Sequence, residues 1–157
     1  MEMLDKGMPA TPSETVQRAW ARLIKAQRSA LGRVERALKS AGLPPLAWYD
    51  ALLELERVGA RGLRPFELER AMLLEQYNLS RLLDRLEKAG YVERRACADD
   101  GRGNVVVITA SGKAMRRRMW PAYAAAIEDA FGRHLSEQQA KNLDALLGAL
   151  IARPHST

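Results

Sequence analysis

The spacing of apolar residues changes from a helical to a strand pattern within residues 91–109, and this change most limits the fold. Residues 91–95 and 104–109 are rich in β-forming residues, and residues 99–103 between them read Asp-Asp-Gly-Arg-Gly. Because Gly and Asp tolerate the positive φ angles of tight turns, this pattern predicts a β-hairpin. The segments on both sides have helical spacing. The sequence therefore predicts a mainly α fold with a small β-wing.

A long helix is predicted near the N-terminus, over residues 13–40. Ser13 or Thr11 is suited to cap its first turn, and Gly42 is suited to end it. Its apolar residues recur at steps of four and three, interrupted only by Gln27, and so form one stripe along the helix. The members of this stripe are Val16, Trp20, Leu23, Leu31, Val34 and Leu38.

Two further helices are predicted in the C-terminal part of the chain. Thr109 or Ser111 caps the first, which runs toward His134 with a bend at Pro121. Ser136 and Gln139 match a capping box, in which the two side chains satisfy helix-end donors reciprocally. The last helix has an apolar face formed by Leu143, Leu146, Leu147, Leu150 and Ile151.

Three shorter helices are predicted between these ends. Pro44-Pro45 opens the first and Gly59 ends it, and Pro65 opens the second after an extended piece at residues 62–64. The third runs from about Gln76 to Ala89. The inward residues of the second are predicted to be Phe66, Leu68, Ala71 and Met72, and those of the third Leu79, Leu82, Leu83 and Leu86. Two short helices joined by a tight turn and followed by a hairpin form a winged helix-turn-helix.

The positive charge of the chain is concentrated in its middle. The net charge is +6. Residues 1–60 hold nine Lys/Arg and seven Asp/Glu, residues 61–118 hold thirteen and eight, and residues 119–157 hold three and four. An excess of five positive charges in the middle indicates an anionic partner there. The sequence shows no membrane span and no secretory signal, and the single cysteine, Cys97, fits a reducing cytoplasm.

The exposed positions of the third short helix carry the chemistry for reading DNA. A helix fits the major groove, where Gln and Asn match the edge of adenine and Arg matches guanine. Contacts from Arg81, Arg85 or Lys88 to phosphates would set the register instead. The candidate DNA-binding residues on this helix are Gln76, Tyr77, Asn78, Ser80, Arg81, Arg85 and Lys88.

Three stretches of the chain resemble the MarR family of transcriptional regulators. They are LSRLLDRLEKAGYVERR at residues 79–95, DGR at residues 100–102, and VIT at residues 107–109 followed by Ser111-Gly112. The resemblance implies a homodimer whose interface is formed by the first and last helices. It also implies that Arg102 enters the minor groove and that Asp100 positions it. One departure is Glu75, which stands where the family often has a capping Ser or Thr.

The resemblance further implies a ligand crevice between the dimer base and the DNA-binding lobe. Its candidate lining residues are Trp20, Trp48, Tyr49, Asp50 and Arg94, a pattern that partly resembles the urate-responsive branch. The ligand expected there is a small aromatic or phenolic anion. The alternative interpretation is that both tryptophans belong to the core and that Asp50 has a structural partner. A redox role for Cys97 is a further hypothesis, because Arg94 and Arg95 would lower its pKa.

The sequence thus predicts a sequence-specific repressor of double-stranded DNA that acts as a dimer on a palindromic operator. The expected organisation is a flexible arm (residues 1–12), a dimerisation helix (13–43), a DNA-binding lobe (44–110), C-terminal dimerisation helices (111–152) and a tail (153–157). No enzyme motif, cofactor site or metal site is predicted, and His134 and His155 are the only histidines. The alternative function is an architectural DNA-binding protein without a ligand, and a protein-interaction module is a third interpretation.

Overall fold

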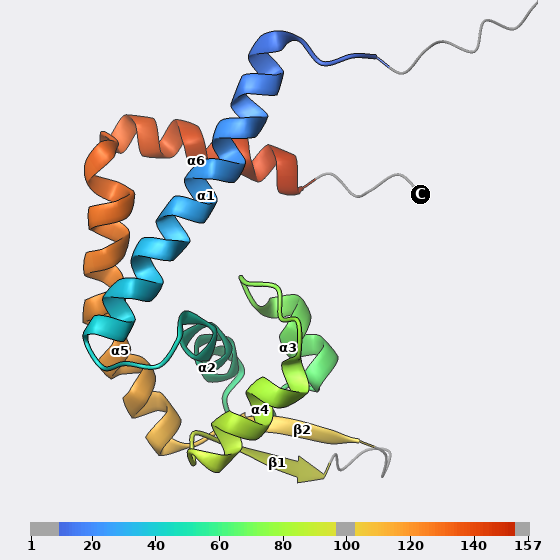
Figure 1. Ribbon diagram of the computed structural model, residues 1–157. Coiled ribbons are helices and arrows are strands. Elements are labelled where there is room, and N and C mark those ends of the chain that lie inside the picture. Colours follow the sequence, from blue (N-terminus) through green and yellow to red (C-terminus); the bar gives the residue numbers. More distant parts are fainter. Residues whose placement is uncertain (1–9, 97–102, 153–157) are drawn as a thin grey trace, which may run out of the picture.

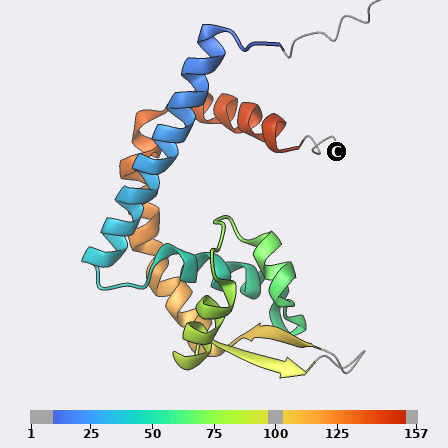
Figure 2. The same ribbon diagram turned by 45° about the vertical axis from the view of Figure 1, so that its right-hand side comes forward.

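The computed structural model describes residues 10–96 and 103–152 and has the predicted mainly α fold with a two-stranded wing (Figure 1). Helices α2, α3 and α4 and the two strands form a lobe, whereas α1, α5 and α6 form an arm that extends away from it (Figures 1 and 2). The elements are α1 (Glu14–Ser40), α2 (Leu46–Val58), α3 (Pro65–Ala71), α4 (Leu79–Lys88), β1 (Val92–Ala96), β2 (Asn104–Ile108), α5 (Ala110–Ala130) and α6 (Glu137–Ile151), with short 3-10 turns at Gly59–Arg61 and Gly132–His134.

The predicted starts of the long helices are confirmed, whereas α5, predicted to run toward His134, ends at Ala130. The Ser13 hydroxyl accepts a hydrogen bond from the Val16 amide at 3.2 Å and caps α1. Thr109 caps α5, and Ser136 and Gln139 form the predicted capping box of α6. These side chains satisfy amide donors that have no partner inside the helix, which explains why the helices begin there.

Helix α4 begins three residues later than the sequence predicts. Its first residue is Leu79, and Asn78 is the residue before it, whose side-chain oxygen accepts from the Arg81 amide at 3.0 Å. The prediction that Gln76, Tyr77 and Asn78 lie on this helix is therefore wrong. They belong to the turn between α3 and α4, because an Asn in the capping position ends the preceding loop.

The inner face of α3 is narrower than predicted. Leu68 and Met72 are buried, but Phe66 is 55% exposed and Ala71 is also exposed. The helix has only seven residues, about two turns, so few of its positions can face the lobe core. The inward placement predicted for Phe66 and Ala71 is wrong.

The wing pairs with a third short segment. Strands β1 and β2 are antiparallel, with Val92 opposite Ile108 and Ala96 opposite Asn104. Leu63 and Val106 exchange backbone hydrogen bonds of 3.0 and 2.7 Å, which attaches the predicted extended piece to β2. Gly62 has a φ of 67°, and a Cβ there would overlap the Val106 carbonyl, so the close approach requires glycine. The wing is thereby fixed to the lobe.

The buried apolar residues of the described part of the chain form two cores. The lobe core is sealed by fully buried residues of α2, α3, α4 and the strands, and its largest members are Leu52, Leu55, Leu68, Leu83, Leu86 and Val106. The second core lies where α1, α2 and α5 meet, around Leu38, Leu46 and Met119. Helix α5 joins the two, since Met115 packs against both. It runs without interruption through Pro121.

The far ends of the arm leave apolar side chains uncovered. Val16 and Trp20 of α1 are 55% and 65% exposed, and Leu146, Leu150 and Ile151 of α6 are 67%, 68% and 82% exposed. The apolar stripe predicted on α1 is therefore buried only in its second half, at Val34 and Leu38. None of the helices within residues 10–96 and 103–152 is long and apolar enough to cross a membrane.

Candidate nucleic-acid interface

Helix α4 buries one face and presents the other to solvent. Leu82, Leu83 and Leu86 lie in the lobe core. At 100° per residue, the direction opposite these leucines lies, around the helix axis, midway between the directions of Ser80 and Arg85. The exposed side chains on this face are Ser80, Arg81, Asp84, Arg85, Glu87 and Lys88. Four of the seven DNA-contacting residues predicted on this helix thus form one continuous surface on α4.

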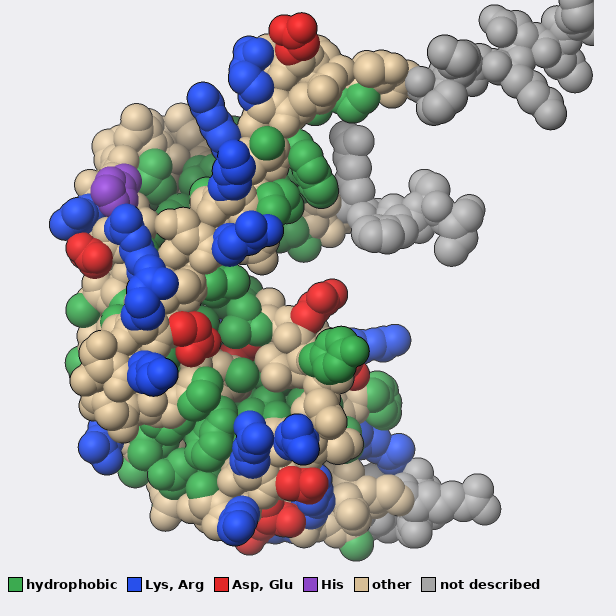
Figure 3. All heavy atoms as spheres, in the orientation of Figure 1, with side chains coloured by type: hydrophobic (Ala, Val, Ile, Leu, Met, Phe, Trp, Pro, Cys, Tyr) green, Lys and Arg blue, Asp and Glu red, His purple; other side chains and the backbone are tan. Residues whose placement is uncertain are grey.

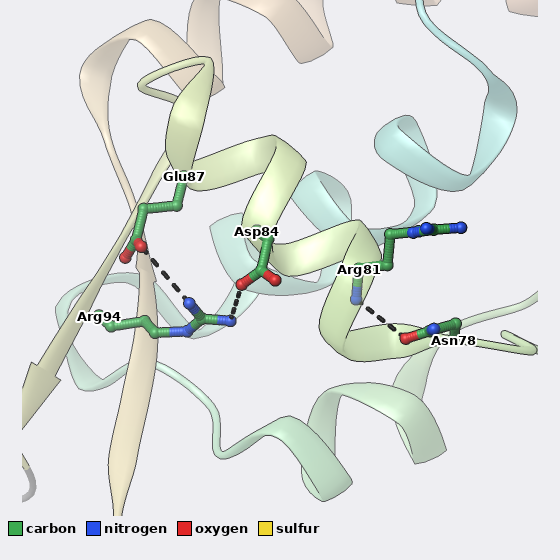
Figure 4. A network of polar contacts seen from close by, with 5 residues as sticks. All are labelled: Asn78, Arg81, Asp84, Glu87 and Arg94. Carbon is green, nitrogen blue, oxygen red and sulfur yellow. Dashed lines mark hydrogen bonds and ion pairs between the residues drawn. The ribbon is translucent and has the colours of Figure 1, made fainter.

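Two carboxylates on this surface are paired with one arginine of the wing, which offsets one of their two negative charges. The Arg94 guanidinium, on β1, lies 2.9 Å from the Asp84 carboxylate and 3.4 Å from that of Glu87 (Figure 4). The Arg81 side chain extends away from this cluster (Figure 4). Unpaired carboxylates on a DNA-facing helix would repel phosphates. Arg94, which the sequence analysis placed in a ligand crevice, instead compensates the negative charge of α4.

The turn before α4 presents the other three predicted contact residues. The Tyr77 side chain is fully exposed, and the side-chain amide nitrogen of Gln76 donates to the Leu74 carbonyl at 3.4 Å. Because the Asn78 oxygen is used to cap α4, only its amide nitrogen is left to donate to a base or phosphate. Asn78 therefore also takes the capping position that the sequence analysis had assigned to Glu75.

Asp50 holds this turn to α2. It is the one buried charged residue in the described part of the chain, and its two carboxylate oxygens accept hydrogen bonds from the backbone amides of Leu73 and Leu74, at 2.9 and 2.8 Å. A carboxylate bonded to two amides in this way is well suited to burial. The alternative interpretation from the sequence is supported for Asp50, which has a structural partner, but it is wrong for Trp20, which it placed in the core and which is 65% exposed. An Asp among the apolar residues of α2 was the signal for the structural partner.

A cavity of about 680 Å³ lies beside Asp50, between α2, the turn after α3, and α5. Three aromatic rings line it: the Tyr49 ring stacks on Trp120 with centroids 6.1 Å apart, and Tyr123 meets Tyr49 edge-on at 4.9 Å. Burial raises the pKa of the Tyr123 phenol above its ordinary value of 10.0, and the charges of Asp50 and Tyr49 add to the effect. The charged side chains on its wall are Asp50, Glu54 and Arg57.

Only two of the five residues predicted to line a ligand crevice, Tyr49 and Asp50, line this cavity. Trp48 is half-buried against the lobe core and meets the Tyr91 ring edge-on, with centroids 5.9 Å apart. Trp20 lies on the exposed half of α1, and Arg94 lies on the wing. The cavity includes Trp120 and Tyr123, which the sequence analysis did not select, because a helical apolar pattern does not show which residues face another helix across a gap.

The predicted tip of the wing lies outside the described residues. This applies to Asp100 and Arg102, for which minor-groove contact stays a prediction, and to Cys97, for which a redox role stays a hypothesis.

The order of α2, α3, α4 and the paired strands, with an exposed basic face on α4, defines a winged helix-turn-helix of the kind found in DNA-binding regulators. The chain belongs to the MarR family. The family model described as MarR family matches residues 41–103, which cover the lobe up to the wing.

The comparisons with known proteins extend over nearly all of the chain. An uncharacterised HTH-type transcriptional regulator of Bacillus cereus is 30% identical over 128 residues, which are 82% of this chain and 83% of that protein. The structure is also similar to that of Sco3205, a MarR family transcriptional regulator from Streptomyces coelicolor in complex with DNA, with a TM-score of 0.82, 27% identity and 95% of each chain covered. The MarR family regulator AbsC of the same organism has a TM-score of 0.77 at 26% identity, over 91% of this chain and 96% of that one.

Proposed function

We propose that this protein is a dimeric repressor that binds double-stranded DNA sequence-specifically and is released by a small aromatic ligand. The observation that carries the proposal is the surface of α4, where Arg81, Arg85 and Lys88 are exposed and Asp84 and Glu87 share an ion pair with Arg94, so that positive charge is in excess. A helix of this width fits the major groove, and its basic side chains face the phosphates on either side. The DNA-bound state of the similar Streptomyces regulator Sco3205 supports the same use of the fold.

The proposed contacts fall into two groups. Arg81 and Ser80 in the first turn of α4, with Gln76, Tyr77 and the Asn78 amide nitrogen in the turn before it, reach base edges or the phosphates beside them. Arg85 and Lys88, further along α4, set the register through phosphates. Arg102, with Asp100, contributes a contact in the minor groove, where a narrow groove concentrates negative potential.

The uncovered apolar side chains of α1 and α6 support the dimer. Side chains such as Trp20 and Leu150 are more than half exposed in one chain, and a second copy is the partner that would cover them. A two-fold dimer would place its two α4 helices on half-sites about 10 bp apart, centre to centre, in a palindromic operator.

The cavity supports an aromatic ligand, because Tyr49, Trp120 and Tyr123 offer ring faces and edges and its volume of about 680 Å³ suits a small molecule. Its wall carries two carboxylates, on Asp50 and Glu54, and one guanidinium, on Arg57. This net negative charge disfavours a phenolate relative to the neutral phenol. The proposal therefore keeps the aromatic ring of the ligand predicted from the sequence and replaces the anion by the neutral form.

DNA recognition is tested by fluorescence-anisotropy titration against the intergenic DNA beside the protein's own gene, with a scrambled duplex at the same salt concentration. We expect a preference of roughly 10³-fold for the native fragment. Arg81→Ala should weaken binding by about 1–3 kcal/mol, whereas Arg133→Ala, which removes an equal charge from the arm, should leave it unchanged. Equal affinity for both duplexes would favour the architectural alternative.

Ligand release is tested separately, by adding aromatic molecules to the preformed complex at a pH below and a pH above the pKa of the added phenol. We expect the neutral phenol to release DNA at lower concentration than its phenolate. Leu53→Trp, which fills the cavity wall without removing Asp50, should abolish release and preserve DNA binding. Release that is unaffected by Leu53→Trp would exclude this cavity as the site.

A further inference from the structure

Helix α1 is the most basic element of the arm. It carries seven Lys/Arg (Arg18, Arg22, Lys25, Arg28, Arg33, Arg36 and Lys39) and two Glu (Glu14 and Glu35), which gives it a net charge of +5. The average over residues 1–60 hides this, because α2 and the first thirteen residues are net negative. The arm is therefore not a neutral region beside a basic lobe.

The basic residues of α1 gather on the side opposite its apolar stripe. At 100° per residue, Arg18, Arg22, Lys25 and Arg36 fall within about 40° of one line, and the apolar stripe of Trp20 and Leu38 lies half a turn away. All four are exposed, and Lys and Arg side chains stand along α1 in the space-filling view (Figure 3). From Arg18 to Arg36 the row extends over about 27 Å. We call these four residues the α1 ridge.

Almost none of this charge is neutralised by the described residues of the chain. Arg18 lies 3.9 Å from Glu14 in an exposed pair, which is weak at best. Among residues 10–96 and 103–152, no ion pair joins Arg22, Lys25 or Arg36 to a carboxylate. Uncompensated positive charges at this density attract a polyanion.

The side chains between these charges indicate what kind of polyanion fits. They are Ala21, Ser29 and Gly32, all small, so the ridge has no large apolar or aromatic anchor. Protein partners are held mainly by such anchors. The phosphate backbone of a duplex needs none, because its binding rests on charge and on the release of counterions. Guanidinium groups also match phosphate oxygens with two hydrogen bonds each.

The ridge lies apart from the proposed recognition surface. Helix α1 rises away from the lobe, whereas α4 and the strands lie at the opposite end of the molecule (Figures 1 and 2). A duplex bound along α4 would leave most of α1 uncovered.

We infer that the α1 ridge is a second DNA-binding surface, which holds the phosphate backbone of another duplex segment without reading its sequence. This goes beyond the proposed function, since it lets one dimer join two DNA segments. A duplex already bound at α4 raises the local concentration of further DNA and favours this second contact.

The test is a bridging assay with the full-length protein and two duplexes, one carrying a donor and the other an acceptor fluorophore. We expect energy transfer at about 50 mM salt. The triple variant Arg22→Gln, Lys25→Gln, Arg36→Gln should reduce this transfer to background, while a single duplex still binds. The matched control Arg118→Gln, Arg133→Gln, Lys141→Gln removes three positive charges from α5, the turn after it and α6, and should bridge like the wild type.

The salt dependence of the second binding event gives an independent readout. Loss of three phosphate contacts should make the slope of log K against log salt shallower by about 3 for each protomer. No bridging by the wild type, or equal bridging by the triple variant, would overturn the inference. Dissociation of the triple variant into monomers would also overturn the inference, because the ridge would then contact the partner subunit.

Failure of the proposed function gives a different result. If α4 does not bind DNA, Arg81→Ala with Arg85→Ala leaves single-duplex binding unchanged, and the triple α1 variant abolishes it. If α4 binds DNA and the ridge does not, Arg81→Ala with Arg85→Ala abolishes single-duplex binding, and the triple α1 variant leaves it unchanged.

Discussion

The lobe and the arm of this protein treat their apolar residues differently. In the lobe, Leu52, Leu55, Leu68 and Leu86 are 0% exposed and the helices close around them. In the arm, the first half of α1 and most of α6 present leucines, a valine and a tryptophan to solvent. Burial of such side chains is the main stabilising term in folding. The apolar residues of the lobe are therefore covered within one chain, whereas many apolar residues of the arm are exposed.

This difference separates two kinds of information in one sequence. The buried apolar residues of the lobe determine its fold, whereas the exposed apolar residues of the arm are those proposed to contact a second copy of the chain. Substitutions that affect one kind and not the other are the way to test the distinction.

The largest expected effect is on assembly. In the proposed dimer, Leu150→Asp would place a carboxylate in the apolar contact at two symmetric positions, at a cost of at least about 2 kcal/mol each, or about 4 kcal/mol in total. This corresponds to roughly a thousandfold weaker dimer. Sedimentation equilibrium measures it. Asn142→Asp, which adds the same charge on the same helix, should leave the dimer intact, and equal weakening by both would show that charge alone is responsible.

The next effect is on the lobe itself. Leu86→Ala removes a side chain that is 0% exposed and should lower the free energy of unfolding by about 3 kcal/mol. Denaturant titration at several protein concentrations separates this loss from assembly. Leu73→Ala, at a position that is 77% exposed, should change stability by less than about 0.5 kcal/mol. A comparable loss at Leu73 would mean that the lobe is not closed as described.

A smaller effect is expected inside the lobe, beside the cavity that separates it from α5. Asp50→Asn leaves one acceptor oxygen for two backbone amides, so one amide of Leu73 or Leu74 loses its partner. We expect a loss of about 2 kcal/mol in unfolding free energy and weaker DNA binding, because the turn before α4 is loosened. Hydrogen exchange at the Leu73 and Leu74 amides should accelerate. Unchanged exchange would show that Asp50 does not hold the turn.

The smallest effect appears only at alkaline pH. Since burial raises the pKa of Tyr123 above 10.0, the native state keeps its phenolic proton where the unfolded chain releases it. This contribution to stability is present below pH 10 and is lost as the pH rises through the native pKa. Tyr123→Phe should therefore lose less stability between pH 9 and 11 than the wild type does. Thermal unfolding at each pH measures this. If the stabilities of Tyr123→Phe and the wild type fell equally between pH 9 and 11, the burial of Tyr123 would be contradicted.

Most of the fold could be predicted from local signals. Ser13, Thr109 and the Ser136–Gln139 pair mark helix starts by residue type alone, and the change of period at residues 91–109 locates the wing. The start of α4 was misplaced because Gln76 and Tyr77 contain no helix breaker. Asn78 carried the necessary signal, since Asn is among the strongest capping residues.

The candidate site was less predictable because its contacts join distant parts of the sequence. Asp50 bonds amides 23 and 24 residues away, and Tyr49 meets Trp120 and Tyr123 across the gap between two helices. A periodic pattern identifies the buried side of one helix and not the element that faces it. Arg94 was predicted to line a ligand crevice, but it pairs with carboxylates of α4, and this pairing depends on how β1 crosses that helix.

Pro121 gives α5 a mechanical property. This helix is one rod of 21 residues, about 31 Å long, with its first turn pressed against the Tyr91 carbonyl at Gly112 and its far end in the arm. Proline has no amide hydrogen, so the rod lacks one of its hydrogen bonds at this level and bends there more easily than elsewhere. The soft point lies between Trp120 and Tyr123, two walls of the cavity. Over half of that length a tilt of roughly 5° displaces the end by more than 1 Å, as the rise per residue requires. In the proposed dimer, a ligand that displaces this cavity wall would change the distance between the lobe and the lobe of the second copy.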